Sequence, residues 1–428
     1  MPKLSWISRL FDRQEAVPAS QGLRFGRELD GAGSICLDDS VIRNHVYISG
    51  KSGTGSKTLV EQLLTQQTER GRGWLYIDPT SDQALLDRLT AAAQEHGRGD
   101  EFFVLDLAKP EDSHCYDILR AGAPEARARR VLELLMAAED TETAHLQSFL
   151  SAVLAAVDAA GFSVGLIELF TVLRPFECKE SLDQLLTAAP ESLDAHTRLA
   201  MNLAKKFDLA AQPELACVLS HLVAKYRELN FGDLADVLNS PEPEICFSDI
   251  LAHNKMCYVR LPILDLGADK FVALTRMVVL DITHASHARL STPKRLRSPF
   301  LLVMDWFPKY GLFNGFRSQT YSQARGLNLA ILPVAGSDDH VARNESELEA
   351  ELVLDGNTYT KVFFQQKQSR SSEAATRVDN LALGEFVMQY GSTQRRGHVA
   401  PAVDVGKPLR APRRAMLRHV SRPRFIST

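Results

Sequence analysis

The chain has 428 residues, of which 45% are hydrophobic and 24% charged, a composition typical of globular proteins with about two or three domains. No run of about 18 apolar residues occurs and the first residues are polar, so we expect neither a transmembrane helix nor a secretory signal. Six scattered cysteines without a C-x-x-C pair favour reduced thiols in a cytoplasmic protein.

The net charge of −4 is unevenly distributed along the chain. A basic tail at residues 401–428 contains seven of the 49 Lys and Arg residues, and after Asp404 it contains no acid. The remaining body is therefore acidic, which argues against a duplex-binding surface over the whole protein. The tail is either a solvated end or a contact for nucleic acid or an anionic membrane, and the sequence leaves both open.

The chain is expected to begin with a loose lead-in at residues 1–20, followed by a strand pair over 23–37 with a glycine-rich turn. Next, the apolar run Val46–Ile48 leads into a glycine-rich segment and then a helical pattern, which is the setting of a phosphate-binding P-loop. The residues predicted to contact a nucleotide are Gly50, Lys51, Ser52, Gly53, Thr54, Gly55, Ser56, Lys57, Thr58 and, later in the chain, Asp305.

This loop departs by one position from the pattern G-x-x-x-x-G-K-[ST]. Aligned on Gly50 and Gly55, it has Ser56 in the lysine slot and Lys57 in the hydroxyl slot, about 100° further around the helix. Aligned on Lys57 and Thr58, it has Lys51 and Ser56 in the glycine slots. Lys51 as an early-loop lysine is a third option. Helix N-terminal N–H groups could still bind phosphate weakly in any alignment.

Strand and helix patterns then alternate, with strands predicted over 73–79 and 102–107 around a helix at 83–97, which indicates a parallel sheet. Leu- and Ala-rich stretches at helical spacing follow, and β patterns then return around a helix at 271–290. Those later strands are predicted at 256–262, 300–305, 327–332 and 360–364. We therefore predict an α/β P-loop NTPase-like domain with a mainly parallel sheet, built from residues 21–122 and 241–400 and interrupted by an all-α domain at 123–240.

The order of these segments resembles the type IV secretion and conjugative coupling proteins, in the branch of plasmid conjugation and Dot/Icm export. The similarity covers roughly residues 22–395 and is carried by segments in family order: His45 before the loop strand, Asp78 and Asp82 within 71–82, 97–107, Tyr258–Pro262, Asp305–Gly311 at the Walker B position, and Gly356–Lys361. The resemblance implies a RecA-like P-loop ATPase core that forms hexamers and uses ATP and magnesium.

The resemblance also implies a cellular setting. It predicts partners among the secretion or conjugation machinery, or an active homologue, at a cytoplasmic location that is peripheral to the inner membrane. Family members usually carry an N-terminal membrane anchor, and none is expected here.

Three catalytic parts implied by the family pattern are altered. Asp305 ends an apolar strand as a magnesium-associated acid should, with Thr58 as the matching hydroxyl in one alignment. Trp306, however, stands where the family has a catalytic Glu, and Gly336-Ser337 stands where it has Gln-Ser. With the shifted lysine, these changes favour a divergent pseudo-ATPase. Arg325 is the candidate for an arginine that acts on a neighbouring subunit.

Three hypotheses follow. The first is an adaptor or scaffold for substrate recruitment, and the second is an ATP-hydrolysing motor that translocates DNA or protein through a channel. The third is a DNA-binding regulator that uses the basic tail. Residues 56, 57 and 306 separate the first two, because a motor needs an acid beside Asp305.

Structural roles are the alternative for several polar residues. Asp78, Asp305 and His45 are each also typical of packed or capping positions. Asp281, His284 and His287 share one helix face, as ligands of a metal would, but their place near a helix C-terminus favours a role without a metal.

Overall fold

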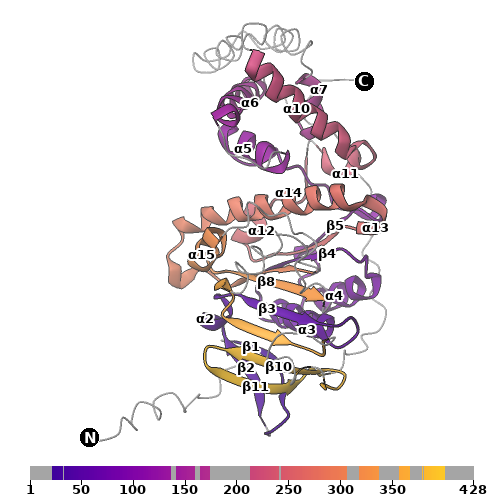
Figure 1. Ribbon diagram of the computed structural model, residues 1–428, viewed down its shortest axis with the longest axis vertical. Coiled ribbons are helices and arrows are strands. Elements are labelled where there is room, and N and C mark those ends of the chain that lie inside the picture. The colour runs from indigo at the N-terminus through magenta and orange to yellow at the C-terminus, as the bar shows by residue number, and fades with distance from the viewer. Residues whose placement is uncertain are drawn as a thin grey trace, which may run out of the picture.

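The computed structural model describes residues 22–31, 33–135, 141–159, 164–173, 213–240, 242–305, 318–336, 356–366, 378 and 380–400. Within them, one sheet of eleven strands runs in the order β2-β1-β11-β10-β9-β3-β8-β7-β4-β6-β5 (Figure 1). A mixed α/β fold is thus formed, as the sequence predicts.

The parallel part of the sheet runs from β9 to β5, with every neighbouring pair parallel. Its strands are short apolar runs that are mostly buried, as expected where helices cover both faces. In sheet order they are β9 (Thr360–Phe363), β3 (Val46–Gly50), β8 (Leu329–Gly336), β7 (Phe300–Met304), β4 (Trp74–Asp78), β6 (Met256–Arg260) and β5 (Phe102–Asp106).

An antiparallel extension continues the sheet beyond β9, and the sequence predicted only its first half. β1 (Gly22–Glu28) and β2 (Ser34–Asp38) are the expected N-terminal strand pair. β10 (Glu385–Tyr390) and β11 (Thr393–His398) form a hairpin that pairs with β9 on one side and β1 on the other. The two ends of the described chain are therefore joined in one sheet.

Helices cover the two faces of the parallel strands. On one face, α3 (Ser56–Glu69) and α4 (Gln83–Glu95) pack against a cluster that includes Trp74 and Tyr76. On the other, α12 (Phe247–Ala252), α14 (Ala268–Ser286) and α15 (Ser318–Gly326) pack with Leu75 and Ile77. This division follows from the pleat, which points successive strand residues to opposite faces. Further short elements are α2 (Asp39–Ile42), α13 (Ile263–Leu266) and 3-10 turns at Gly99–Glu101, Pro110–Asp112, Gly232–Leu234, His287–Ser291 and Lys294–Leu296.

The described segments between β5 and β6 are helical and gather beyond α14, at the end of the molecule opposite the antiparallel strands (Figure 1). They are α5 (Pro124–Leu135), α6 (Thr141–Ala159), α7 (Leu166–Val172), α10 (Pro213–Leu229) and α11 (Ala235–Leu238). Their apolar side chains belong to the same cluster as α14. The boundaries near residues 122 and 240 remain predictions.

A buried ion pair connects this helical part to the sheet. Arg130 of α5 pairs with Asp281 of α14, and the Tyr116 hydroxyl donates to the same carboxylate at 2.8 Å. His284, on the same helix, lies 3.4 Å from Glu133 of α5. Asp281 and His284 therefore act at a helix–helix contact, and no metal-binding cluster is present among the described residues.

His45 is a packed residue at the start of β3, at the opposite end of that strand from the P-loop. Its Nδ1 accepts from the Ile331 N–H at 3.0 Å, so its Nε2 carries the proton and donates to the Tyr321 carbonyl at 2.8 Å. Burial, the largest influence, lowers the pKa of His45 to about 4. The structural alternative for this histidine is thus the one that the fold supports.

We predict a pH-dependent loss of stability that His45 causes. Below about pH 6.5 the unfolded chain binds a proton at this residue and the folded chain does not until about pH 4. The free energy of unfolding should therefore fall by about 2 kcal/mol between pH 7 and pH 5 through His45 alone. Urea denaturation at both pH values should show a smaller loss for His45→Gln, while His284 contributes equally to both proteins. Equal losses would contradict the assignment.

Candidate functional site

The P-loop is shaped by two glycines that pack against Phe364. A Cβ on Gly50 would lie 2.6 Å from Phe364 Cβ, and one on Gly55 would lie 2.8 Å from Phe364 Cε1. Gly55 also has φ of 125°, which side chains rarely adopt, and α3 begins at the next residue, Ser56. The geometry thus agrees with the alignment on Gly50 and Gly55, in which Ser56 takes the lysine slot.

Backbone hydrogen bonds fix the P-loop to segments that follow β9 and precede β10. Lys51 donates its N–H to the Gln365 carbonyl at 2.8 Å, and the Gly384 N–H donates to the Thr54 carbonyl at 2.9 Å. Leu59 makes the first backbone bond of α3, to Gly55. The N–H groups of the three residues before Leu59 have no helical partner, and such groups suit an anion.

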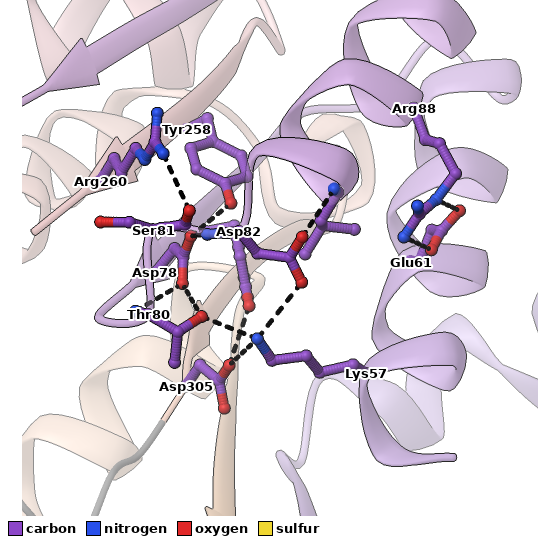
Figure 2. Close-up of polar contacts among 12 residues, drawn as sticks. Lys57, Glu61, Asp78, Thr80, Ser81, Asp82, Arg88, Tyr258, Arg260 and Asp305 are labelled. Carbon is purple, nitrogen blue, oxygen red and sulfur yellow. Dashed lines mark hydrogen bonds and ion pairs between the residues drawn. The ribbon is translucent and has the colours of Figure 1, made fainter. Parts of the chain in front are cut away.

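Lys57 directs its side chain across to the loop after β4 (Figure 2). Its Nζ donates to Thr80 Oγ1 at 2.7 Å and lies 3.5 Å from Asp82 Oδ2. The same Nζ lies 3.9 Å from Asp305 Oδ2, after β7. The ion pair with Asp305 is therefore made by the residue in the hydroxyl slot, one position before Thr58.

Asp78 is the buried acid that orders the loop after β4. One of its oxygens accepts from the Thr80 N–H at 2.8 Å and the Thr80 hydroxyl at 2.7 Å. The other accepts from the Asp82 N–H at 2.8 Å and the Tyr258 hydroxyl at 2.7 Å. A buried carboxylate is tolerated only with such donors. Burial, with the charge of Asp78 next, raises the pKa of the Tyr258 phenol, which keeps its proton for this bond.

Arg260 holds the same loop from the end of β6. Its guanidinium donates to the Ser81 carbonyl at 2.8 Å and to Asp106 at 3.0 Å. Ser81 has φ of 59°, a strained value for a residue with a side chain. Asp82 then caps α4 by accepting from the Leu85 N–H at 3.0 Å. These contacts place Thr80 and Asp82 where Lys57 reaches them.

Asp305 lies directly after β7 with only 6% of its side chain exposed, compared with 39% for Lys57. The Tyr76 hydroxyl donates to its Oδ2 at 3.0 Å. Burial raises the pKa of the Tyr76 phenol well above its ordinary value, and the charge of Asp305 adds to the shift. An acidic cluster is thus formed, in which Asp82 and Asp305 flank one ammonium group and Thr80 links that group to Asp78.

Other predicted site residues are divided between the two edges of the sheet. Gly336 pairs directly with Gly50, so the position predicted for a γ-phosphate sensor is beside the loop. Arg325 comes just before β8 at the opposite edge, in a pocket of about 270 Å³ that also includes Lys361. Arg325 therefore does not meet the loop of its own chain. Trp306 and Ser337 lie outside the described residues.

Sequence reasoning missed several partners in this site. No sequence signal marks Thr80 as the acceptor of the Lys57 hydrogen bond. Tyr76 and Tyr258 lie within predicted strands, where aromatic residues are typical of a core. Only the order of the strands in the sheet shows that their hydroxyls donate to Asp305 and Asp78, respectively. Gln366 donates to the Ser49 hydroxyl at 3.1 Å. Gln366 could have been predicted as a site residue, because it is a polar residue that follows the carboxyl end of a parallel strand.

One curated protein is similar in sequence, although no protein-family model matches the chain. Type 4 coupling protein DotL of Legionella pneumophila is 19% identical over 417 residues, covering 84% of this chain and 53% of the relative. The chain thus spans about half the length of that relative.

Solved structures share the fold. The unbound conjugative coupling protein TrwBdeltaN70 is 12% identical, with a TM-score of 0.57 over 91% of both chains. TrwB in complex with ADP and Mg2+ matches with 12% identity and a TM-score of 0.58 over 96% of this chain and 95% of TrwB. VirB4 of Thermoanaerobacter pseudethanolicus matches with 16% identity and a TM-score of 0.53 over 89% of this chain and 97% of VirB4. The chain therefore shares the fold of TrwB and VirB4. Of the helices that the structure describes, none has the length and apolar character to cross a membrane.

We predict that Asp78 is a structural acid and that Asp82 is not critical for stability. Asp78→Asn should lower the free energy of unfolding by about 3 kcal/mol, because an amide nitrogen would face N–H and O–H donors. Asp82→Asn, a matched change, should cost less than about 1 kcal/mol, because Asn is an equally good helix N-cap. Urea denaturation followed by circular dichroism measures both, and equal losses would contradict the distinction.

Proposed function

We propose that this chain, which belongs to the type IV secretion and conjugative coupling-protein family of P-loop ATPases, is a subunit that does not hydrolyse nucleotide. In this proposal it serves a coupling complex as an adaptor or scaffold for substrate recruitment. Its RecA-like domain would pack against an active homologue or other secretion machinery, and its helical part would recruit the substrate.

The observation that carries this proposal is the start of α3 at Ser56 directly after Gly55. Phosphoryl transfer in P-loop enzymes uses a lysine on the β- and γ-phosphates and a hydroxyl on magnesium. In this loop the first position carries a short neutral side chain, and the second carries an ammonium that pairs with Asp305. In the sequence, Trp306 stands where the family has a catalytic Glu, and Gly336 stands where it has a Gln, so two further groups are missing. Loss of a single such group commonly costs about 100-fold in rate.

A nucleotide contact without turnover is part of the proposal. TrwB has been solved with ADP and Mg2+ and with non-hydrolysable GTP and ATP analogues. For this chain, the N–H groups that open α3 would hold a phosphate weakly. They would orient it without supplying the charge that hydrolysis needs.

Assembly contacts are proposed at two further places. Arg325, at the edge opposite the P-loop, would face a neighbouring subunit in an oligomer. The basic tail, which lies outside the described residues, would contact nucleic acid or an anionic leaflet and keep the protein at the inner membrane.

We expect the purified chain to hydrolyse ATP no faster than its own Asp305→Asn variant, because no working catalytic group depends on that acid. A phosphate-release assay with magnesium compares the two proteins at equal concentration. Turnover that is fast in the natural chain and lost in Asp305→Asn would overturn the proposal and favour a motor that translocates DNA or protein. A combined Ser56→Lys, Lys57→Ser and Trp306→Glu variant serves as the positive comparison, since it returns three of the missing groups.

A further inference from the structure

The acidic cluster beside the loop contains a cation that the chain itself supplies. Lys57 Nζ is 2.7 Å from Thr80 Oγ1, 3.5 Å from Asp82 and 3.9 Å from Asp305 (Figure 2). The chain brings these acceptors from two different strand ends to one point. A position that faces a strand-end acid and a helix N-terminus is where P-loop proteins hold magnesium.

The residues around that point do not fit magnesium. Mg²⁺ requires oxygen ligands at about 2.0–2.1 Å in octahedral geometry. The slot that should provide a hydroxyl provides an ammonium, which has only donors and no lone pair. The Thr80 hydroxyl already accepts from Lys57 and donates to Asp78. The Lys57 ammonium therefore occupies the position of the cation, and the nearest neutral oxygen, that of Thr80, is already hydrogen bonded.

We infer that the Lys57 ammonium replaces the divalent metal in this site. Asp305 is almost fully buried, and a buried carboxylate is costly without a compensating charge. Lys57 provides that charge in every state of the site, whereas a metal arrives with the nucleotide. The inference rests on the proposed function, and it adds that phosphate binding gains nothing from magnesium.

The lysine also acts as a mechanical link. It extends from the second residue of α3 to the loop after β4 and to the end of β7. Asp78 and Arg260 hold that loop through hydrogen bonds to Thr80 and Ser81, so Lys57 joins α3 to a loop that is itself fixed. The ammonium thus connects α3, the loop after β4 and the end of β7.

Manganese binding to the nucleotide-free chain tests the replacement directly. Electron paramagnetic resonance counts Mn²⁺ bound by the natural chain, by Lys57→Ser and by Lys57→Ser combined with Asp305→Asn. We expect at least about tenfold tighter Mn²⁺ binding in Lys57→Ser, lost again when Asp305 is neutralised, because the serine removes the ammonium and places a hydroxyl oxygen on the side of Asp82 and Asp305. Lys57→Met, which removes the charge but keeps the bulk, is expected to gain less.

Two results would overturn the inference. One is Mn²⁺ binding by the natural chain that Asp305→Asn abolishes, which can be measured even if the Lys57 variants do not fold. The other is a folded Lys57→Ser protein, verified by circular dichroism, with no gain in Mn²⁺ affinity.

Melting with ADP provides the second measurement. The shift in Tm caused by ADP should be the same in excess magnesium and in EDTA for the natural chain. For the exchanged chain, Ser56→Lys with Lys57→Ser, the shift should be larger with magnesium. A magnesium-dependent shift in the natural chain overturns the metal replacement but leaves the non-hydrolysing scaffold intact, whereas Asp305-dependent ATP turnover overturns the scaffold itself.

Discussion

A carboxylate buried at the end of β4 must be hydrogen bonded, and this requirement for Asp78 organises the whole site. Its four donors are the backbone N–H groups of Thr80 and Asp82 and the hydroxyl groups of Thr80 and Tyr258. Together they fix one arrangement of the loop after β4. That arrangement turns the Thr80 oxygen toward α3. The contact of Lys57 with Thr80 is therefore a consequence of how Asp78 is hydrogen bonded.

The close approach of Phe364 to the P-loop is the second constraint. Two glycines are needed at that approach, and they determine where α3 can begin. We propose that this backbone has the shape that P-loop proteins use for phosphate, with the lysine one position later than in their sequence pattern. A charge that usually serves the nucleotide serves the protein's own acids instead.

Parallel strands give the sheet two edges with different roles. The carboxyl ends of β3, β4, β7 and β8 bring Gly50, Asp78, Asp305 and Gly336 to one edge. His45 and Arg325 come before strands and lie at the other edge, which is why neither meets the loop of the same chain. The helical part is joined to this framework through Arg130 and Asp281.

The sequence by itself determined the parallel strands, the helices between them and the strand-end positions of Asp78 and Asp305, because buried runs and helical spacing are local patterns. It also indicated that the loop departs by one position from the P-loop pattern, but it left two alignments and the Lys51 option open. The tertiary structure favours the alignment on Gly50 and Gly55, because both glycines lie against Phe364, more than 300 positions away in the chain. The β10–β11 hairpin escaped prediction because β11 is largely polar and becomes a strand by pairing with β10 on one side and β1 on the other. The partners of Lys57 were likewise decided by the fold, because Thr80 and Asp305 meet it only where separate strands end side by side.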